Sequence, residues 1–149
     1  HHHQRARPHP GQRRQEGERQ VSSLMNALPG ATQYSLVPAR QRSGTGTTNG
    51  TGVDVSAAEG MGVALLDVNT ESGTSPTLDV KLQECDTSGG TYTDIAGAVF
   101  TQVTTGASAQ KIPIDLSLAK KFVRAVGVAG GTSPVFAWGV QILGFKKYN

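Results

Sequence analysis

The chain has 149 residues, of which 17% are charged, 5% are aromatic and 19 are glycine. This length favours a single domain, and the shortage of helix formers beside an excess of turn formers favours an all-β fold. No apolar run reaches the roughly 20 residues that a membrane-spanning helix needs. The single cysteine, Cys85, excludes an internal disulfide. We therefore expect synthesis in a cytosol and no membrane association.

The positive charge lies at the start of the sequence. Residues 1–20, HHHQRARPHPGQRRQEGERQ, hold five arginines, two glutamates and all four histidines. The rest of the chain carries nine Lys or Arg and nine Asp or Glu, so the net charge of +3 belongs to this arm. The arm lacks apolar periodicity and cannot bury enough apolar surface to fold alone. We expect it to become ordered on a neighbouring chain.

The candidate partner-binding residues are the arginines of this arm, because guanidinium groups suit carboxylates and backbone carbonyls. They are Arg5, Arg7, Arg13, Arg14 and Arg19. A tag remnant and nucleic-acid binding are competing interpretations. The arm has no aromatic residue to stack on bases, and no basic patch continues into the body, so nucleic acid is disfavoured. Adjacent histidines lack the fixed spacing of a zinc site, so we expect no metal and no other cofactor.

The segment after the arm combines a predicted helix with a predicted linker. VSSLMNAL (21–28) places Val21, Leu24, Met25 and Leu28 on one face of a short helix, which ends at Pro29-Gly30. YSLV (34–37) predicts a brief strand, and RQRSGTGTTNGTG (40–52) predicts a flexible loop or linker. The chain is thus divided into an extended basic arm and linker, residues 1–50, and a β-sandwich domain, residues 51–149.

From residue 51 onward, short strands alternate with turns. VDVSA (53–57) begins the series, and MGVALLDVN (61–69) is apolar enough to be covered on both faces. TLDVKLQEC (77–85) alternates, with Leu78, Val80 and Leu82 on one side. DTSGG (86–90) predicts a turn, and Ala96-Gly97 predicts a bulge between TYTDI (91–95) and AVFTQV (98–103).

The last part of the chain predicts three more strands. In AQKIPIDL (109–116), Pro113 indicates an edge strand. KFVRAVGV (121–128) is followed by PVFAWGVQILGF (134–145), where Phe136, Trp138, Val140 and Ile142 share a face. About eight short strands in roughly 100 residues predict a jelly-roll-like antiparallel β-sandwich with an extended N-terminal arm. Its thin core of Ala, Val and Gly favours association in a closed ring.

The sequence predicts no catalytic site, and we expect no enzyme. Glu84, Asp86 and Asp94 could pair as acids or bind calcium, but a turn start and a solvent-facing strand account for them better. Because every histidine lies in the arm, neither a Ser-His-Asp set nor an activated Cys85 can be assembled. Trp138 could be a sugar-stacking platform, but its place in an alternating strand predicts a core residue.

The order TLDVKLQECDTSGGTYTDIAGAVFTQV, then AQKIPIDLSLAKKFVRAVGVAGGTSPVFAWGVQILG, resembles small β-sandwich proteins of tailed-bacteriophage capsid modules. The likeness lies in the DVKLQE strand, the Ser/Gly turn, the TYTDIAGA segment, the KKFVRAV strand and the GGTSP turn. It implies a decoration or cement protein that binds the outside of the shell, often as a trimer. It implies no catalytic residue, and it offers no counterpart of the arm.

We therefore expect a virion structural protein, made in the host cytoplasm, that binds the outer capsid surface and bridges capsomers. Its partners would be the major capsid protein and further copies of itself, as a homotrimer, with the arm clamping neighbouring subunits. Two alternatives stay open. One is a glycan- or receptor-binding module that uses loops 86–90 or 129–134 and an exposed Trp138. The other is a tail or head–tail connector protein, which sixfold or twelvefold rings would indicate.

Overall fold

We describe the fold from a computed structural model, which describes residues 30–147. In this part of the chain there are seven strands and no helix. The strands are β1 (Ala31–Ser43), β2 (Gly46–Asn49), β3 (Val53–Asp54), β4 (Ala58–Cys85), β5 (Thr93–Val99), β6 (Ala107–Asp115) and β7 (Phe122–Lys146).

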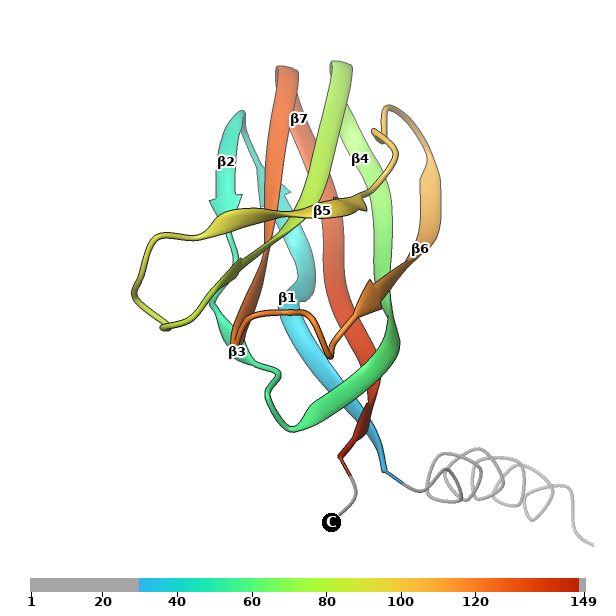
Figure 1. The fold of residues 1–149 in the computed structure, drawn as a ribbon. Coiled ribbons are helices and arrows are strands. Elements are labelled where there is room, and N and C mark those ends of the chain that lie inside the picture. Colours follow the sequence, from blue (N-terminus) through green and yellow to red (C-terminus); the bar gives the residue numbers. More distant parts are fainter. Residues whose placement is uncertain (1–29, 148–149) are drawn as a thin grey trace, which may run out of the picture.

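β4 and β7 form one long antiparallel pair that bends over in its middle (Figure 1). The pairing runs from Ala58 opposite Lys146 to Cys85 opposite Phe122. Because the pair folds back on itself, each of the two strands contributes one half to each of two packed layers. We call the place where it folds, residues 70–77 and 130–134, the bent end.

The first layer has the strand order β1, β7 (135–146), β4 (58–70) and β6. The second layer has β2 and β3 beside β7 (122–130), followed by β4 (77–85) and β5. This is the strand order of a jelly roll, so the predicted jelly-roll-like antiparallel sandwich is confirmed.

The end of the sandwich opposite the bend is called the terminal end, because the described chain enters and leaves there. The Lys146 backbone N–H donates to the Gly30 carbonyl over 2.6 Å, and the Lys147 N–H donates to the Ala57 carbonyl over 2.9 Å. In Figure 1 the start of β1 and the end of β7 lie together at this end. The connections 55–57, 86–92 and 116–121 belong to it as well.

The bend is made by the same tetrapeptide in both strands. GTSP occurs at residues 73–76 in β4 and again at 131–134 in β7. In each copy the serine has a positive φ, 46° at Ser75 and 49° at Ser133, which non-glycine residues seldom adopt. The two threonines, Thr74 and Thr132, pair across the ladder. The repeated tetrapeptide therefore forms a twin corner.

Each corner glycine lies against the proline of the other copy. A methyl group added to Gly73 would lie 2.9 Å from the Cα of Pro134, and one added to Gly131 would lie 2.9 Å from the Cα of Pro76. Gly73 and Gly131 also have φ values of +129° and +98°, where only glycine is unstrained. The close approach and the backbone conformation therefore both require glycine.

Replacing Gly73 or Gly131 by alanine should lower the free energy of unfolding by about 1–3 kcal/mol each, because the new methyl meets backbone at a strained φ. Urea unfolding measures this. Gly89→Ala is the matched control, since nothing lies within 4 Å of a methyl added there. Equal losses for Gly73→Ala and Gly89→Ala would contradict the role of the twin corner.

The core fills the space between the two layers and follows the predicted alternation. Leu78, Val80 and Leu82 of the second layer are buried, as predicted, and so is the row of β7 in the first layer. That row consists of Phe136, Trp138, Val140 and Ile142. Phe136 and several leucines are the largest fully buried side chains, so the core does not consist of Ala and Val alone.

Two sequence predictions about the start of the body are wrong. Residues 40–52, predicted as a loop or linker, include the end of β1 and all of β2, and both strands pair with β7. The sandwich thus includes residues 31–49, which had been assigned to the arm and linker. β2 has no buried side chain and only Thr48 half-buried, so its strand conformation comes from pairing and not from an apolar pattern.

Arg42 supports the irregular middle of β1. Its Nη1 donates to the carbonyls of Trp138 (2.9 Å) and Arg40 (3.1 Å), and its Nη2 donates to that of Pro38 (2.9 Å). The guanidinium lies 5.0 Å from the centre of the Trp138 ring. Burial, and then the nearby charge of Arg40, lower the Arg42 pKa. One side chain thus supports the irregular middle of β1, where the register shifts.

Strand boundaries also differ from the prediction in β4 and β7. Segments 61–69 and 77–85 are one strand, and so are 121–128 and 134–145, because the twin corner bends the ladder without breaking it. The bulge at Ala96-Gly97 is confirmed by the register shift between β4 and β5. β6, which contains Pro113, pairs only with β4 and is the predicted edge strand.

Candidate interaction surfaces

The arginines predicted to bind a partner lie outside the described residues. Arg5, Arg7, Arg13, Arg14 and Arg19 all precede residue 30, as does the helix predicted for residues 21–28. The surfaces that can be built from side-chain geometry are those of the sandwich, which presents two outer faces and two ends.

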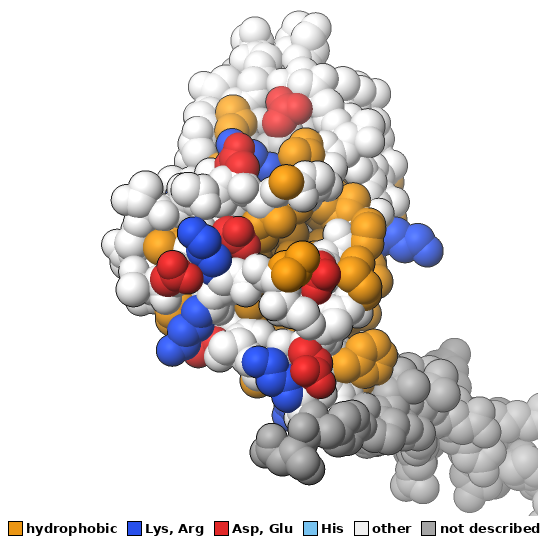
Figure 2. Space-filling model, viewed as in Figure 1, with side chains coloured by type: hydrophobic (Ala, Val, Ile, Leu, Met, Phe, Trp, Pro, Cys, Tyr) orange, Lys and Arg blue, Asp and Glu red, His pale blue; other side chains and the backbone are white. Residues whose placement is uncertain are grey.

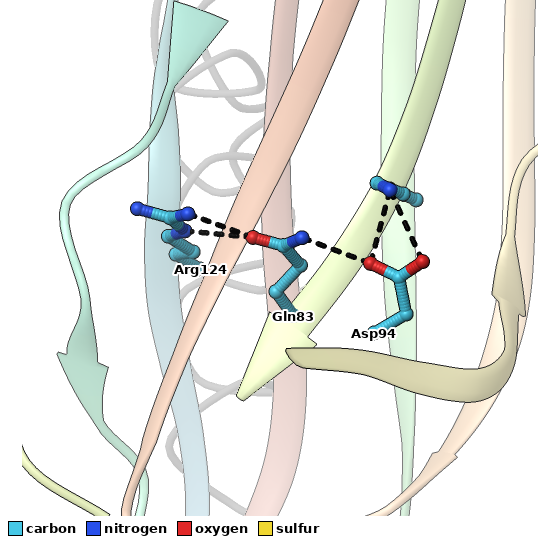
Figure 3. A network of polar contacts seen from close by, with 4 residues as sticks. Gln83, Asp94 and Arg124 are labelled. Atoms are coloured by element: carbon cyan, nitrogen blue, oxygen red, sulfur yellow. Dashed lines mark hydrogen bonds and ion pairs between the residues drawn. The ribbon is translucent and has the colours of Figure 1, made fainter. Parts of the chain in front are cut away.

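The outer face of the second layer carries a row of polar side chains across three strands (Figure 3). Arg124 on β7 donates from Nε and Nη2 to Oε1 of Gln83 on β4, over 3.0 and 2.8 Å. Gln83 Nε2 donates to Asp94 on β5 over 2.8 Å, and Lys81 Nζ lies 3.0 Å from the same carboxylate. The guanidinium of Arg124 also lies 4.3 Å from the centre of the Tyr92 ring.

In this row each charge is matched by a partner, so the row acts as a cross-strand clasp. Hydrogen bonds from Gln83 and then from Lys81 lower the Asp94 pKa, and the Lys81 charge adds to the effect. The lowered pKa keeps the Asp94 carboxylate ionised, which does not suit a general acid. Its oxygens already bind Gln83 and Lys81, so they are not free to bind calcium.

The three acids singled out in the sequence do not converge on one point. Glu84 pairs with Thr93 and Gln83 pairs with Asp94, so the Glu84 and Asp94 side chains leave opposite faces of the sheet. Glu84 accepts a hydrogen bond from the Lys120 N–H over 3.1 Å. Asp86 is exposed at the start of the turn. Among residues 30–147 no three His, Cys, Asp or Glu side chains are grouped to hold a metal ion.

Cys85 and Trp138 are core residues, as the sequence predicts. Trp138 is 3% exposed and Cys85 is 8% exposed. A sugar cannot stack on a buried ring, so the glycan site imagined around Trp138 is ruled out in this form. Loops 86–90 and 129–134 lie at opposite ends of the sandwich, so they do not form one site together. Across the described residues, no helix is long and apolar enough to cross a membrane.

The outer face of the first layer carries an apolar strip that the sequence indicated only in part. The strip consists of Met61, Val63 and Leu65 on β4 with Leu143 and Phe145 on β7. Met61 is 58% exposed, Val63 36% and Phe145 49%, and the two leucines are half-buried. The apolar density of 61–69 predicted a strand covered on both faces. In the described part of the chain, only its inner face is covered.

The strip leads into a groove of about 500 Å³ on the same face. Its lining includes the small residues Ser35, Ala39, Ala109 and Gly139, apolar residues such as Leu65 and Val140, and the polar side chains of Asp67, Lys111 and Gln141. No aromatic side chain lines it. The groove therefore suits a packed polypeptide better than a stacked sugar ring.

The two ends of the sandwich differ strongly in polarity. Leu118 is 81% exposed and lies at the terminal end, with Met61 and Phe145 near it. The other exposed large apolar side chains are Val63 and Val99, in the middle of their layers, and Val128, close to the bent end. The bent end is built mostly from Ser, Thr, Gly and Pro in 43–46, 71–77, 101–106 and 130–134, and Glu71 is the single charged residue in these segments. In Figure 2 the upper, bent end is almost free of coloured side chains, whereas charges of both signs and apolar groups gather below.

The comparisons with known proteins identify a fold. No family model matches the sequence, and no curated protein matches it. The PBSX exported protein XepA has a similar structure, with a TM-score of 0.55 and 17% identity over 79% of this chain and 38% of that one. A chain of the T13 viral particle of IBDV has a TM-score of 0.53 and 15% identity over 78% and 31%.

The chain thus spans about a third of the length of these two proteins, and at such identities the likeness concerns the sandwich fold alone.

Replacing Asp94 by asparagine should destabilise the protein more at pH 7 than at pH 2. The folded-state pKa of Asp94 lies below that of an ordinary aspartate, so its ionised form favours folding. That contribution is present above about pH 4 and is lost as the pH falls through the folded-state pKa. Urea unfolding at both pH values measures this contribution. An equal loss of unfolding free energy in Asp94→Asn at pH 7 and at pH 2 would contradict the clasp.

Replacing Gln83 by leucine should raise the Asp94 pKa, because the hydrogen bond from Gln83 is the largest cause of its lowering. A carboxyl NMR titration measures this pKa, and an unchanged value would contradict the role of Gln83.

Proposed function

We propose that this protein is a structural component of a virion that binds the outer capsid surface as a decoration or cement protein. The observation that carries the proposal is the polarity of the sandwich. Leu118, the most exposed large apolar side chain in residues 30–147, lies at the terminal end, where the chain from the cationic arm enters at Gly30. The bent end is a polar cap. A molecule built in this way attaches through one end and presents the other to solvent.

The arm and the terminal end would act together on the shell. Five arginines in residues 1–20 would meet acidic side chains or carbonyls of neighbouring capsid subunits, while Leu118 and its loop would contact the subunit below. Two linked contacts bind more tightly than either alone, because the second forms at a high effective concentration. Bridging two capsomers in this way would stabilise the assembled shell. A closed homotrimer would repeat the contact three times.

The comparisons support this proposal at the level of the fold. One similar structure is a chain of a viral particle, with which this chain shares the sandwich fold. The resemblance of residues 77–149 to phage capsid modules points the same way. A glycan-binding module loses its main argument with the burial of Trp138. A tail or connector protein would differ in ring symmetry.

Substitution of one exposed apolar residue at the terminal end, and of another away from it, tests which end of the sandwich attaches to the capsid. Leu118→Asp should weaken binding to capsids of the encoding virus by about tenfold or more, which corresponds to about 1.4 kcal/mol. Val99→Asp is the control, because Val99 is 61% exposed but lies on β5, opposite Lys81 in the middle of the second layer and away from the terminal end. Co-sedimentation with capsids measures both. Equal binding by the two variants would contradict attachment through the terminal end.

Replacing the five arm arginines by glutamine should reduce capsid occupancy and make the remaining binding less dependent on salt. Exposed guanidinium pairs are screened as ionic strength rises, so only the parent protein should lose affinity steeply between low and high salt. Circular dichroism should report an unchanged sandwich. Occupancy that is equal for parent and variant would remove the arm from the mechanism.

A further inference from the structure

We infer that the apolar strip of the first layer is the docking site of residues 21–28 of the same chain, which thereby fix the root of the cationic arm to the sandwich. The inference concerns the free protein and does not depend on the proposed capsid function. Three independent observations carry it: the uncovered strip, the geometry at Gly30, and the composition of the segment.

The strip is a surface that needs a cover. Met61, Val63 and Phe145 expose between a third and three fifths of their surface on a sheet face where Leu65 and Leu143 are only half-buried. The register places Val63 opposite Leu143, so the exposed groups form one continuous patch on adjacent strands. Such a patch beside a groove is typical of a face on which another segment packs.

Gly30 places the root of the preceding chain at one end of the strip. Gly30 is in a turn, with φ of 76°, and its carbonyl accepts the Lys146 N–H. Pro followed by Gly with positive φ is the signature of a type II turn, which reverses the chain. Ala31 pairs with Phe145, so a turn at Pro29-Gly30 would lie at one end of the strip. The segment 21–28 is thus joined to the sandwich beside the strip, and a reversal there would bring it onto the strip.

The segment has the composition and length of a cover. VSSLMNAL is uncharged, unlike the arginine-rich residues before it, and Val21, Leu24, Met25 and Leu28 have helical spacing. Eight helical residues extend about 12 Å. The strip from Met61 to Leu65 covers four strand steps, or about 13 Å. Leu28, two residues from Gly30, would lie near Phe145, and Val21 would lie near Leu65.

A segment of the same chain is favoured over a second copy by proximity. The tether between Leu28 and Ala31 is two residues, so the effective concentration of the segment at its own strip is far above that of any neighbour's segment. Docking would hold the start of the arm against the first layer, so the arginines would leave the body in one defined direction.

Thiol labelling of the full chain tests the inference. In a Cys85→Ala background, Val63→Cys should react with a maleimide about fivefold more slowly than when Leu24, Met25 and Leu28 are also changed to serine, because docking would cover it. Val99→Cys, on the second layer, is the matched control and should react equally with and without the serine changes. Met61→Cys is a second probe of the strip.

The outcomes are distinct. Docking within one chain is supported if Val63→Cys and Met61→Cys react more slowly without the serine changes than with them, and if this difference does not depend on protein concentration. Equal rates with and without the serine substitutions overturn the inference. Protection that appears only at high protein concentration also overturns it, and assigns the strip to the segment of a second copy. None of these outcomes requires capsids, so a failure here leaves the proposed function standing.

Discussion

In the described part of the chain, every strand hydrogen-bonds to β4 or to β7. β1, β2 and β3 pair with β7, while β5 and β6 pair with β4. The pairing of these two long strands with each other therefore determines where all the others can lie. Because the pair bends once at the GTSP corners, one ladder serves both layers, and the core forms between its two halves. A register error in this ladder would turn the buried rows of both layers to solvent.

The parts of the fold that follow from local chemistry could be predicted from the sequence. The alternation of Leu78, Val80 and Leu82, the buried row around Trp138 and the edge position of Pro113 all reflect period-2 patterning or backbone restrictions. β2 could not be predicted in this way, because GTTN has no apolar residue and pairs only through its backbone with β7. The continuity of β4 and β7 was hidden by glycine, serine and proline, which usually end strands.

The repeated GTSP was the signal that sequence reasoning did not use. Two identical turn-like tetrapeptides, each within a long β-rich region, indicate an equivalent bend in paired strands. Of the candidate sites, the surroundings of Cys85, Asp94 and Trp138 were predicted correctly. The many apolar side chains of residues 61–69 indicated the β4 part of the apolar strip. Its β7 part and its place beside Gly30 could not be predicted, because they depend on long-range strand pairing.

The two outer faces differ in how far their groups are satisfied within the sandwich. On the second layer, Arg124, Gln83, Asp94 and Lys81 bind one another, and the exposed large apolar side chains are Val99 and Val128. On the first layer, apolar groups remain exposed next to a groove whose lining includes several small residues. The first layer therefore carries the continuous apolar strip, and the described chain enters beside one end of that strip.

The position of β7 has a consequence for synthesis. β7 is the last strand of the described chain, yet it lies inside both layers, between β1 and β4 in one and beside β2, β3 and β4 in the other. While the ribosome is still translating residues 122–146, the earlier strands lack the neighbour that most of them need. Such a nascent chain exposes unpaired strand edges, which favour aggregation until the last strand emerges. A domain with this topology completes its sheets only after the last strand has been synthesised, and its folding rate is limited by contacts between residues distant in sequence.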